Sequence, residues 1–124
     1  MKFSAITENH LYSKAYSKGK RYVTERLAVY ILPDYAASRL AKAHPEKKRV
    51  NRIGLTVSKK LGGAVLRNRT KRILREGLRA AMAARPMKTG FLIVVAARTA
   101  AVTSSSPVIA RDLTRALQKL ELYA

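Results

Sequence analysis

Apolar residues recur along the chain with two different periods, which separate strands from helices. In residues 27–32 and 53–58 the odd-numbered positions are apolar, as expected for one face of a β-strand. Residues 91–97 are almost continuously apolar, which is typical of a strand covered on both sides. Residues 8–18, the stretch after Gly63 and residues 106–120 instead repeat apolar positions every three or four residues, which predicts helices. The chain is therefore predicted to combine a sheet with several helices.

Glycine, proline and serine indicate where these elements end. Gly19 is expected to follow the first helix, and Pro33 is expected to end the strand at 27–32. Ser106 and Pro107 are expected to be the N-cap and the first residue of the last helix. The long connection at residues 34–51 is predicted to be a loop insertion. A single domain at residues 1–124 accounts for the whole pattern.

The helix predicted after Gly63 has an apolar side and a cationic side. The packing side is expected to contain Leu66, Thr70, Ile73, Leu74, Gly77, Ala80 and Ala81. The other side carries Asn68, Arg69, Lys71, Arg72, Arg75 and Arg79, and it extends roughly 16 Å at about 1.5 Å per residue. Glu76 is the only acid in residues 57–79, so these cations repel one another unless an anion binds. The pattern favours a nucleic-acid-binding face; a merely solvated helix surface is the alternative.

The composition of the chain supports a polyanionic partner. The 124 residues are 48% hydrophobic, enough for the core of a small domain, and contain 26 Lys and Arg against 7 Asp and Glu. The net charge of +19 fits nucleic acid or an anionic membrane. No apolar run approaches the roughly 20 residues of a spanning helix, and the N-terminus lacks the apolar core of a signal peptide. We therefore expect a cytoplasmic protein with no membrane association.

Residues suited to catalysis are scarce in this chain. The acids occur singly, and no pair has the spacing of a two-metal nuclease site. His10 and His44 are far apart and belong to no metal-binding motif, and there is no cysteine. We therefore expect neither a catalytic residue nor a metal site in the polypeptide, and we do not expect it to cut RNA by itself.

The centre of the chain resembles the signature segment of the bacterial ribonuclease P protein subunit. Ser58-Lys59-Lys60 precede a glycine-rich turn, and Arg67-Asn68-Arg69 match the Arg-Asn-Arg motif of that family. Tyr12 and Tyr16 match an aromatic pair that stands just before a Lys-Gly pair in the family, although its first position is more often Phe. The resemblance is strong over residues 57–79 and weaker elsewhere.

The chain departs from the family pattern at two further places. Gly63 stands where the family often has Asn or Lys, so a polar side chain is missing there. Thr99 follows Arg98 where the family often has Pro, which makes the local turn uncertain from the sequence. The connection at 34–51 is longer than is common in the family.

The resemblance implies both a fold and a function. The fold is a single-domain α/β sandwich of the α+β class, with the order αβββαβα, a mixed sheet and a left-handed βαβ crossover, similar to ribosomal protein S5 domain 2. The function is that of the auxiliary protein subunit of the ribonuclease P holoenzyme, an endoribonuclease that matures tRNA 5′ ends. Its implied partners are the catalytic RNA and the 5′ leader of precursor tRNA. The RNA subunit performs the chemistry with Mg²⁺ that it mainly holds itself, and no obligate protein partner is expected.

The family motifs imply two groups of RNA-binding residues. Those expected to bind the catalytic RNA are Arg67, Asn68, Arg69, Lys71, Arg72, Arg75 and Arg79. Those expected to bind the leader are Tyr12, Tyr16, Tyr30, Ser58, Lys59, Lys60 and Arg98. Aromatic residues at such spacing are often core residues, so a packing role for the tyrosines stays open.

Two other functions are compatible with the charge. A structural RNA-binding protein of the ribosomal type explains the cations equally well, but not the aromatic residues or the central motif. A DNA-binding module that uses residues 66–79 as a recognition helix lacks a preceding helix, because residues 53–57 are predicted to be a strand.

Overall fold

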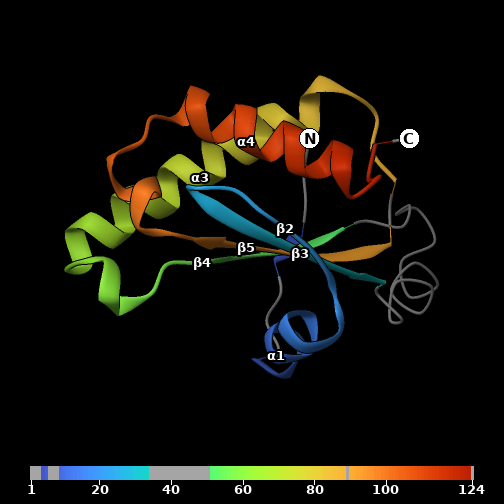
Figure 1. The fold of residues 1–124 in the computed structure, drawn as a ribbon, viewed down its shortest axis with the longest axis horizontal. Coiled ribbons are helices and arrows are strands. Elements are labelled where there is room, and N and C mark those ends of the chain that lie inside the picture. Colours follow the sequence, from blue (N-terminus) through green and yellow to red (C-terminus); the bar gives the residue numbers. More distant parts are fainter. Residues whose placement is uncertain (1–3, 6–8, 34–50, 89, 124) are drawn as a thin grey trace.

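The computed structural model describes residues 4–5, 9–33, 51–88 and 90–123 as a mixed α+β domain. The strands are β1 (Ser4–Ala5), β2 (Lys20–Val23), β3 (Leu27–Pro33), β4 (Arg52–Thr56) and β5 (Phe91–Ala97). The helices are α1 (Asn9–Lys18), α3 (Ala64–Ala84) and α4 (Ser106–Lys119), with the short 3-10 helices η1 (Lys59–Leu61) and η2 (Thr99–Thr103). Helix α1 lies on one face of the sheet, and α3 and α4 lie on the other (Figure 1).

The strands form one mixed sheet in the order β1-β4-β5-β3-β2. The β2–β3 and β3–β5 pairs are antiparallel, whereas β4 is parallel to both β5 and β1. Helix α3 therefore connects two parallel neighbours, β4 and β5. After the short strand β1, the order of elements is the predicted αβββαβα. The left hand of the crossover stays a prediction.

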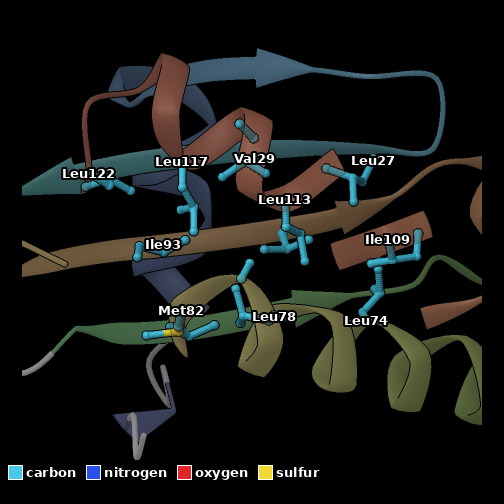
Figure 2. Close-up of a cluster of buried hydrophobic side chains, with 14 of the residues drawn as sticks. Leu27, Val29, Leu74, Leu78, Met82, Ile93, Ile109, Leu113, Leu117 and Leu122 are labelled. Atoms are coloured by element: carbon cyan, nitrogen blue, oxygen red, sulfur yellow. The ribbon is translucent and has the colours of Figure 1, made fainter. Parts of the chain in front are cut away.

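The main core lies between the sheet and the helices α3 and α4 (Figure 2). The odd-numbered residues of β3, including Leu27 and Val29, point into it as predicted, together with Ile93 of β5. Each large side chain removed from water contributes about 1.5–3 kcal/mol. Gly77 lets the two helices approach closely, because a Cβ atom there would lie 2.7 Å from Cγ2 of Ile109.

A smaller cluster lies under α1, on the opposite face of the sheet. Its buried members are Ala15, Leu32, Leu92 and Val94, and Leu11, Tyr12 and Tyr30 pack against it. Leu11 and Ala15 thus face inward as the periodicity predicts. Because one short helix of 10 residues covers this face, only part of the sheet is buried beneath it.

Several element boundaries differ from those predicted. The apolar pattern did not predict strand β2, which the order implied by the resemblance includes, because its residues are mostly polar and exposed at the edge of the sheet. Strand β4 ends at Thr56 rather than at Ser58. Pro33 is the last residue of β3, where a missing N–H does least harm. The N-cap of α4 is Ser105 and not Ser106, since the Ile109 N–H already donates to the Ser105 carbonyl (3.1 Å).

The connection predicted at 34–51 is described only at its last residue, because residues 34–50 lie outside the described part of the chain. Asn51 is buried, and its Nδ2 donates to the carbonyl of Lys88 at 3.0 Å. Its Oδ1 accepts from the N–H of Phe91 at 3.1 Å. Asn51 therefore ties the start of β4 to the start of β5, and the insertion itself stays a prediction.

Candidate nucleic-acid interface

Helix α3 buries one side and exposes a row of polar and cationic residues on the other. The buried residues are Thr70, Ile73, Leu74, Gly77, Leu78, Ala81 and Met82. The exposed ones are Asn68, Arg69, Arg72, Arg75 and Arg79, while Arg67 and Lys71 are partly buried. The prediction that Ala80 packs inward is wrong. Ala80 is exposed, and Leu78 and Met82 are buried instead, because α4 packs along that side of α3.

The cations of α3 are not neutralised by acids within the described part of the chain. The ion pairs seen between described residues both use Asp112, which contacts Arg26 at 3.5 Å and Arg111 at 4.0 Å. Glu76 is exposed on α3 and takes part in neither pair. Like charges on successive helical turns repel one another. The exposed side of α3 therefore carries positive charge that neither of these ion pairs offsets.

Within the Arg-Asn-Arg motif, the protein holds one arginine in a fixed place. An Nη1 atom of Arg69 donates to the carbonyl oxygen of Val102 in η2, at 3.0 Å. The Nε atom of Arg67 is buried and has no hydrogen-bond partner among the described residues. The side chain of Asn68, between them, is exposed and bonded to no other described residue. Arg69 is thus oriented by its hydrogen bond to η2, whereas the amide of Asn68 is exposed to solvent.

Tyr16 and Tyr30 meet on the sheet face that carries α1. Their ring centroids are 4.8 Å apart and the rings are nearly perpendicular, at 86°, an edge-to-face pair. The Tyr16 hydroxyl lies 3.2 Å from Oγ1 of Thr56 in β4. Tyr16 is nevertheless 43% exposed. It is therefore held from two directions while offering much of its surface to solvent.

Tyr12 lies deeper than Tyr16 on the same face. A Cβ atom at Gly54 of β4 would lie 2.4 Å from Cε1 of Tyr12, so the ring rests directly on this glycine. Burial raises the pKa of Tyr12, and the neighbouring Tyr16 raises that pKa further. Tyr12 packs against the cluster under α1 and leaves a smaller surface exposed than Tyr16 does. The absence of a side chain at Gly54 thus leaves the space that Tyr12 occupies.

Ser58 is the N-cap of η1, which begins with Lys59 and Lys60 shortly after the end of β4. The Ser58 hydroxyl accepts a hydrogen bond from the N–H of Lys60 at 3.1 Å and so caps the turn. All three side chains are exposed. The serine therefore orients the turn from which the two lysines project.

Arg98 follows β5 and is tied to the turn between β2 and β3. Its Nη1 donates to the carbonyl of Thr24 at 2.8 Å, and its backbone N–H donates to the carbonyl of Arg26 at 2.9 Å. The side chain remains exposed. A 3-10 turn, η2, follows at Thr99, which answers the question raised by the absence of proline there.

Residues from both predicted groups meet at one edge of the sheet. Thr56 of β4 is paired in register with Ala96 of β5 in a parallel arrangement. Ser58 and Arg98 each lie two residues beyond that pair, at the carboxyl ends of adjacent strands. Tyr16 contacts Thr56 at the same level. Helix α3 starts a few residues after η1, so its cations begin near this edge as well.

The comparison with known protein families assigns the chain. The family model described as Ribonuclease P matches residues 1–121. The chain belongs to the ribonuclease P protein family. The ribonuclease P protein component of Dehalococcoides mccartyi is 37% identical over 119 residues, which cover 96% of this chain and 86% of that protein. The corresponding protein of Clostridium acetobutylicum is 35% identical over 81% of this chain and 74% of its own length.

Solved structures of ribonuclease P proteins share the fold. The Staphylococcus aureus RNase P protein is 28% identical, with a TM-score of 0.73, and the match covers 99% of this chain and 100% of that chain. The Thermotoga maritima RNase P protein has a TM-score of 0.68 at 22% identity over 90% of this chain and 93% of that one, a likeness of fold alone. The α+β fold predicted from the resemblance is confirmed.

Membership of the ribonuclease P family confirms the predicted class of function. The chain is an RNA-binding, auxiliary component of a ribonucleoprotein endoribonuclease of tRNA processing, and its partner is the RNase P RNA. No match supports the ribosomal alternative. The DNA-binding alternative required a helix before α3, and strand β4 and the turn η1 stand there instead.

The described residues of this ribonuclease P protein offer no metal-binding cluster. Within that part of the chain, no three His, Asp or Glu side chains lie together. The side chain of His10 and the whole of His44 lie outside the described residues. No helix in the described ranges is long and apolar enough to cross a bilayer.

Sequence reasoning missed one group of residues near Arg98. Thr24, Arg26 and Asp112 form a hydrogen-bonded cluster beside it. Asp112 is 3% exposed on the buried side of α4, next to Leu113 and three residues after Ile109. An acid at an otherwise apolar position of a helix is the signal that identifies such a residue.

Proposed function

We propose that this ribonuclease P protein binds two RNA elements with two adjacent surfaces. The exposed cations of α3, together with Arg67, Asn68 and Lys71, bind phosphates of the catalytic RNA. The carboxyl ends of β4 and β5, with the tyrosines beside α1, hold the single-stranded 5′ leader of precursor tRNA. The protein thereby assists removal of the leader, while the RNA subunit performs the cleavage.

The charge and length of α3 support the first surface. Arg72, Arg75 and Arg79 occupy successive turns, and together with Asn68 they span roughly 16 Å along the helix. A surface of that length reaches several phosphates. Each phosphate contact by Lys or Arg releases condensed counterions, so binding is expected to weaken steeply with salt.

The second surface combines an exposed ring with flexible cations. Tyr16 presents an accessible aromatic surface, and Tyr30 and Thr56 fix its position. Stacking of a base on such a ring contributes about 1–3 kcal/mol and differs little between bases. Lys59, Lys60 and Arg98 are exposed at the same edge and are available to phosphates. Tyr12 and Tyr30 are assigned to the margin of this surface because they are more buried.

The observation that carries the proposal is the meeting of exposed Tyr16 with exposed lysines and Arg98 at one edge of the sheet. A core role for Tyr16 does not require cations at that edge. Binding of a leader strand requires both an exposed aromatic ring and nearby cations, because the strand presents bases and phosphates together.

Magnesium is assigned to the RNA subunit in this proposal. The described side chains do not offer the clustered carboxylates that hold Mg²⁺ in protein nucleases, so they do not fit the ion. Bound to the RNA, Mg²⁺ supplies the activation of water and the stabilisation of charge on the scissile phosphate. The protein contributes affinity and position only. Its expected place of action is the cytoplasm, where precursor tRNA is made.

The proposal is tested by comparing precursor and mature tRNA as ligands of the reconstituted holoenzyme. Tyr16→Ala is expected to weaken precursor binding about 5- to 150-fold, the equivalent of one lost stacking contact, and to leave mature tRNA binding unchanged. Tyr16→Phe keeps the ring and loses only the contact with Thr56, so it is the matched control. An equal loss of affinity for precursor and mature tRNA in Tyr16→Ala would indicate that Tyr16 has only a packing role.

A competition assay distinguishes specific binding of the ribonuclease P RNA from a general affinity for polyanions. The cognate catalytic RNA is expected to displace labelled catalytic RNA at far lower concentration than duplex DNA or ribosomal RNA does, at moderate salt. Equal competition by all three would contradict the proposed α3 surface.

A further inference from the structure

Asp112 is the only acid that the described part of the chain buries, and Nε of Arg111 lies 4.0 Å from its Oδ1. It lies on α4 among Ile109, Leu113 and Ala116, all fully buried. A carboxylate in such surroundings is costly unless it is hydrogen-bonded. Its Oδ2 accepts from the Thr24 hydroxyl at 3.1 Å and from Nη1 of Arg26 at 3.5 Å. Both donors belong to the turn between β2 and β3.

The Thr24 hydroxyl organises that turn. Its oxygen accepts from the backbone N–H groups of Arg26 (3.3 Å) and Leu27 (3.2 Å). A hydroxyl has one proton, and Asp112 is the nearer and the charged acceptor for it, compared with the Leu27 carbonyl at 3.3 Å. Asp112 therefore orients the hydroxyl and ties α4 to this turn, which is also closed by the backbone bond from the Thr24 N–H to the Leu27 carbonyl (2.8 Å).

The same turn holds Arg98 on its other side. The Thr24 carbonyl accepts from Nη1 of Arg98 at 2.8 Å, and the Arg26 carbonyl accepts from the backbone N–H of Arg98 at 2.9 Å. The guanidinium is thus held to the turn through Nη1, and the side chain stays exposed. Thr24 thus links the two residues, because its hydroxyl donates to Asp112 and its backbone carbonyl accepts from Arg98.

We infer that Asp112 is a positioning residue for the leader site, holding the Arg98 guanidinium in place through the β2–β3 turn. The inference rests on the proposed function, because Arg98 lies beside Ser58, Lys59 and Lys60 at the edge assigned to the leader. An arginine already held to the turn loses less conformational freedom when it binds a phosphate. An acid in α4, remote from the tyrosines, thereby favours the binding of an anion.

The sign of the effect distinguishes this role from general electrostatics. Asp112→Asn keeps the shape of the side chain and one acceptor oxygen but removes the negative charge, which weakens the bonds from Thr24 and Arg26. By charge alone the substitution should strengthen RNA binding. Loss of positioning predicts the opposite for precursor tRNA, whose affinity should fall about three- to tenfold while mature tRNA binding stays unchanged. Glu121→Gln, an exposed acid just after α4, removes the same charge and is the matched control.

A double-mutant cycle links Asp112 to Arg98. In an Arg98→Ala background, Asp112→Asn is expected to cause no further loss of the precursor-to-mature affinity ratio. Thr24→Val removes the hydroxyl that donates to Asp112 and accepts from the Arg26 and Leu27 N–H groups, and it leaves the acid charged; it is expected to lower the precursor-to-mature ratio as Asp112→Asn does. It also keeps the test available if the Asp112 variant fails to fold, which thermal unfolding of each variant reports.

Three results would overturn the inference: an unchanged or higher precursor affinity in Asp112→Asn, equal losses for both tRNAs, or additive losses in the cycle. The failure of the leader site itself looks different. If Arg98→Ala leaves the precursor-to-mature affinity ratio unchanged while Tyr16→Ala lowers it, the leader site is supported and the role of Asp112 is contradicted. If neither variant changes this ratio, the leader site and the role of Asp112 are both contradicted.

Discussion

Gly54 is the position where a single added methyl group tests the placement of the tyrosines most sharply. In Gly54→Ala, the new Cβ would lie 2.4 Å from Cε1 and 2.5 Å from the hydroxyl oxygen of Tyr12. Non-bonded carbon atoms normally approach to about 3.5–4.0 Å, so the Tyr12 ring must move by about 1 Å or more. Overpacking of this kind typically costs about 1–3 kcal/mol.

We expect Gly54→Ala to lower the free energy of unfolding by about 2 kcal/mol and the Tm by roughly 5–10 °C. Precursor tRNA affinity should fall as well, because the displaced ring disturbs the surface next to Tyr16, while affinity for the catalytic RNA alone stays the same. Urea and thermal unfolding measure the first effect, and binding of precursor and mature tRNA by the holoenzyme measures the second.

Gly63→Ala is the matched control for this experiment. A Cβ atom at Gly63 meets nothing within 4 Å, and the backbone there is extended, so stability should change by less than about 1 kcal/mol. The clash is tested directly by combining Gly54→Ala with Tyr12→Ala, since the methyl group should cost nothing extra once the ring is gone. Wild-type stability in Gly54→Ala, or full additivity in the pair, would show that Tyr12 does not rest on Gly54.

Three further predictions concern charge, pH and helix packing. Replacing Arg72, Arg75 and Arg79 by Ala should reduce the slope of log affinity for the catalytic RNA against log salt by about 2–3. The equal charge change in α4 (Arg111, Arg115 and Lys119) should leave that slope nearly unchanged, and the same slope in both triple variants would refute the α3 surface. The pKa of Tyr12 is raised in the folded protein, so the stability that this shift contributes is present below the unfolded pKa and is lost as pH rises above about 10. Urea unfolding at a series of pH values should show a smaller loss of stability at alkaline pH in Tyr12→Phe than in the wild type, and identical pH profiles would contradict the burial of the phenol. Gly77→Ala should lower stability by about 1–3 kcal/mol, measured by urea unfolding, because its Cβ would lie 2.7 Å from Ile109; wild-type stability would place the α3–α4 contact elsewhere.

The sequence predicted the elements that bury a regular stripe of apolar residues. Strand β5 was predicted at its observed limits because it is covered on both faces and its apolar run has clear ends. The apolar pattern did not predict strand β2, since Lys20 and Arg21 at the sheet edge give no apolar alternation. Its place depends on pairing with β3, a tertiary contact that a local pattern does not record.

The residues of the candidate site that belong to a sequence motif or a helical period could be predicted, whereas the contacts that depend on tertiary packing could not. The cations of α3 could be read from the helical period, and the aromatic pair from the resemblance. The burial of Tyr12 over Gly54 and the bond from Arg69 to Val102 depend on how separate elements meet. The role of Asp112 was hidden for the same reason, because its partner Thr24 lies 88 residues away in the chain.

The dependence of cleavage on leader length tests the two-surface account most directly. Precursor tRNAs with a long leader and with a leader of one nucleotide are cleaved by the catalytic RNA with and without this protein, and kcat/KM is compared. The account predicts that the protein raises kcat/KM much more for the long leader, and that Tyr16→Ala and Arg98→Ala remove most of this difference. An equal increase for both leaders would contradict a leader-binding surface on this protein.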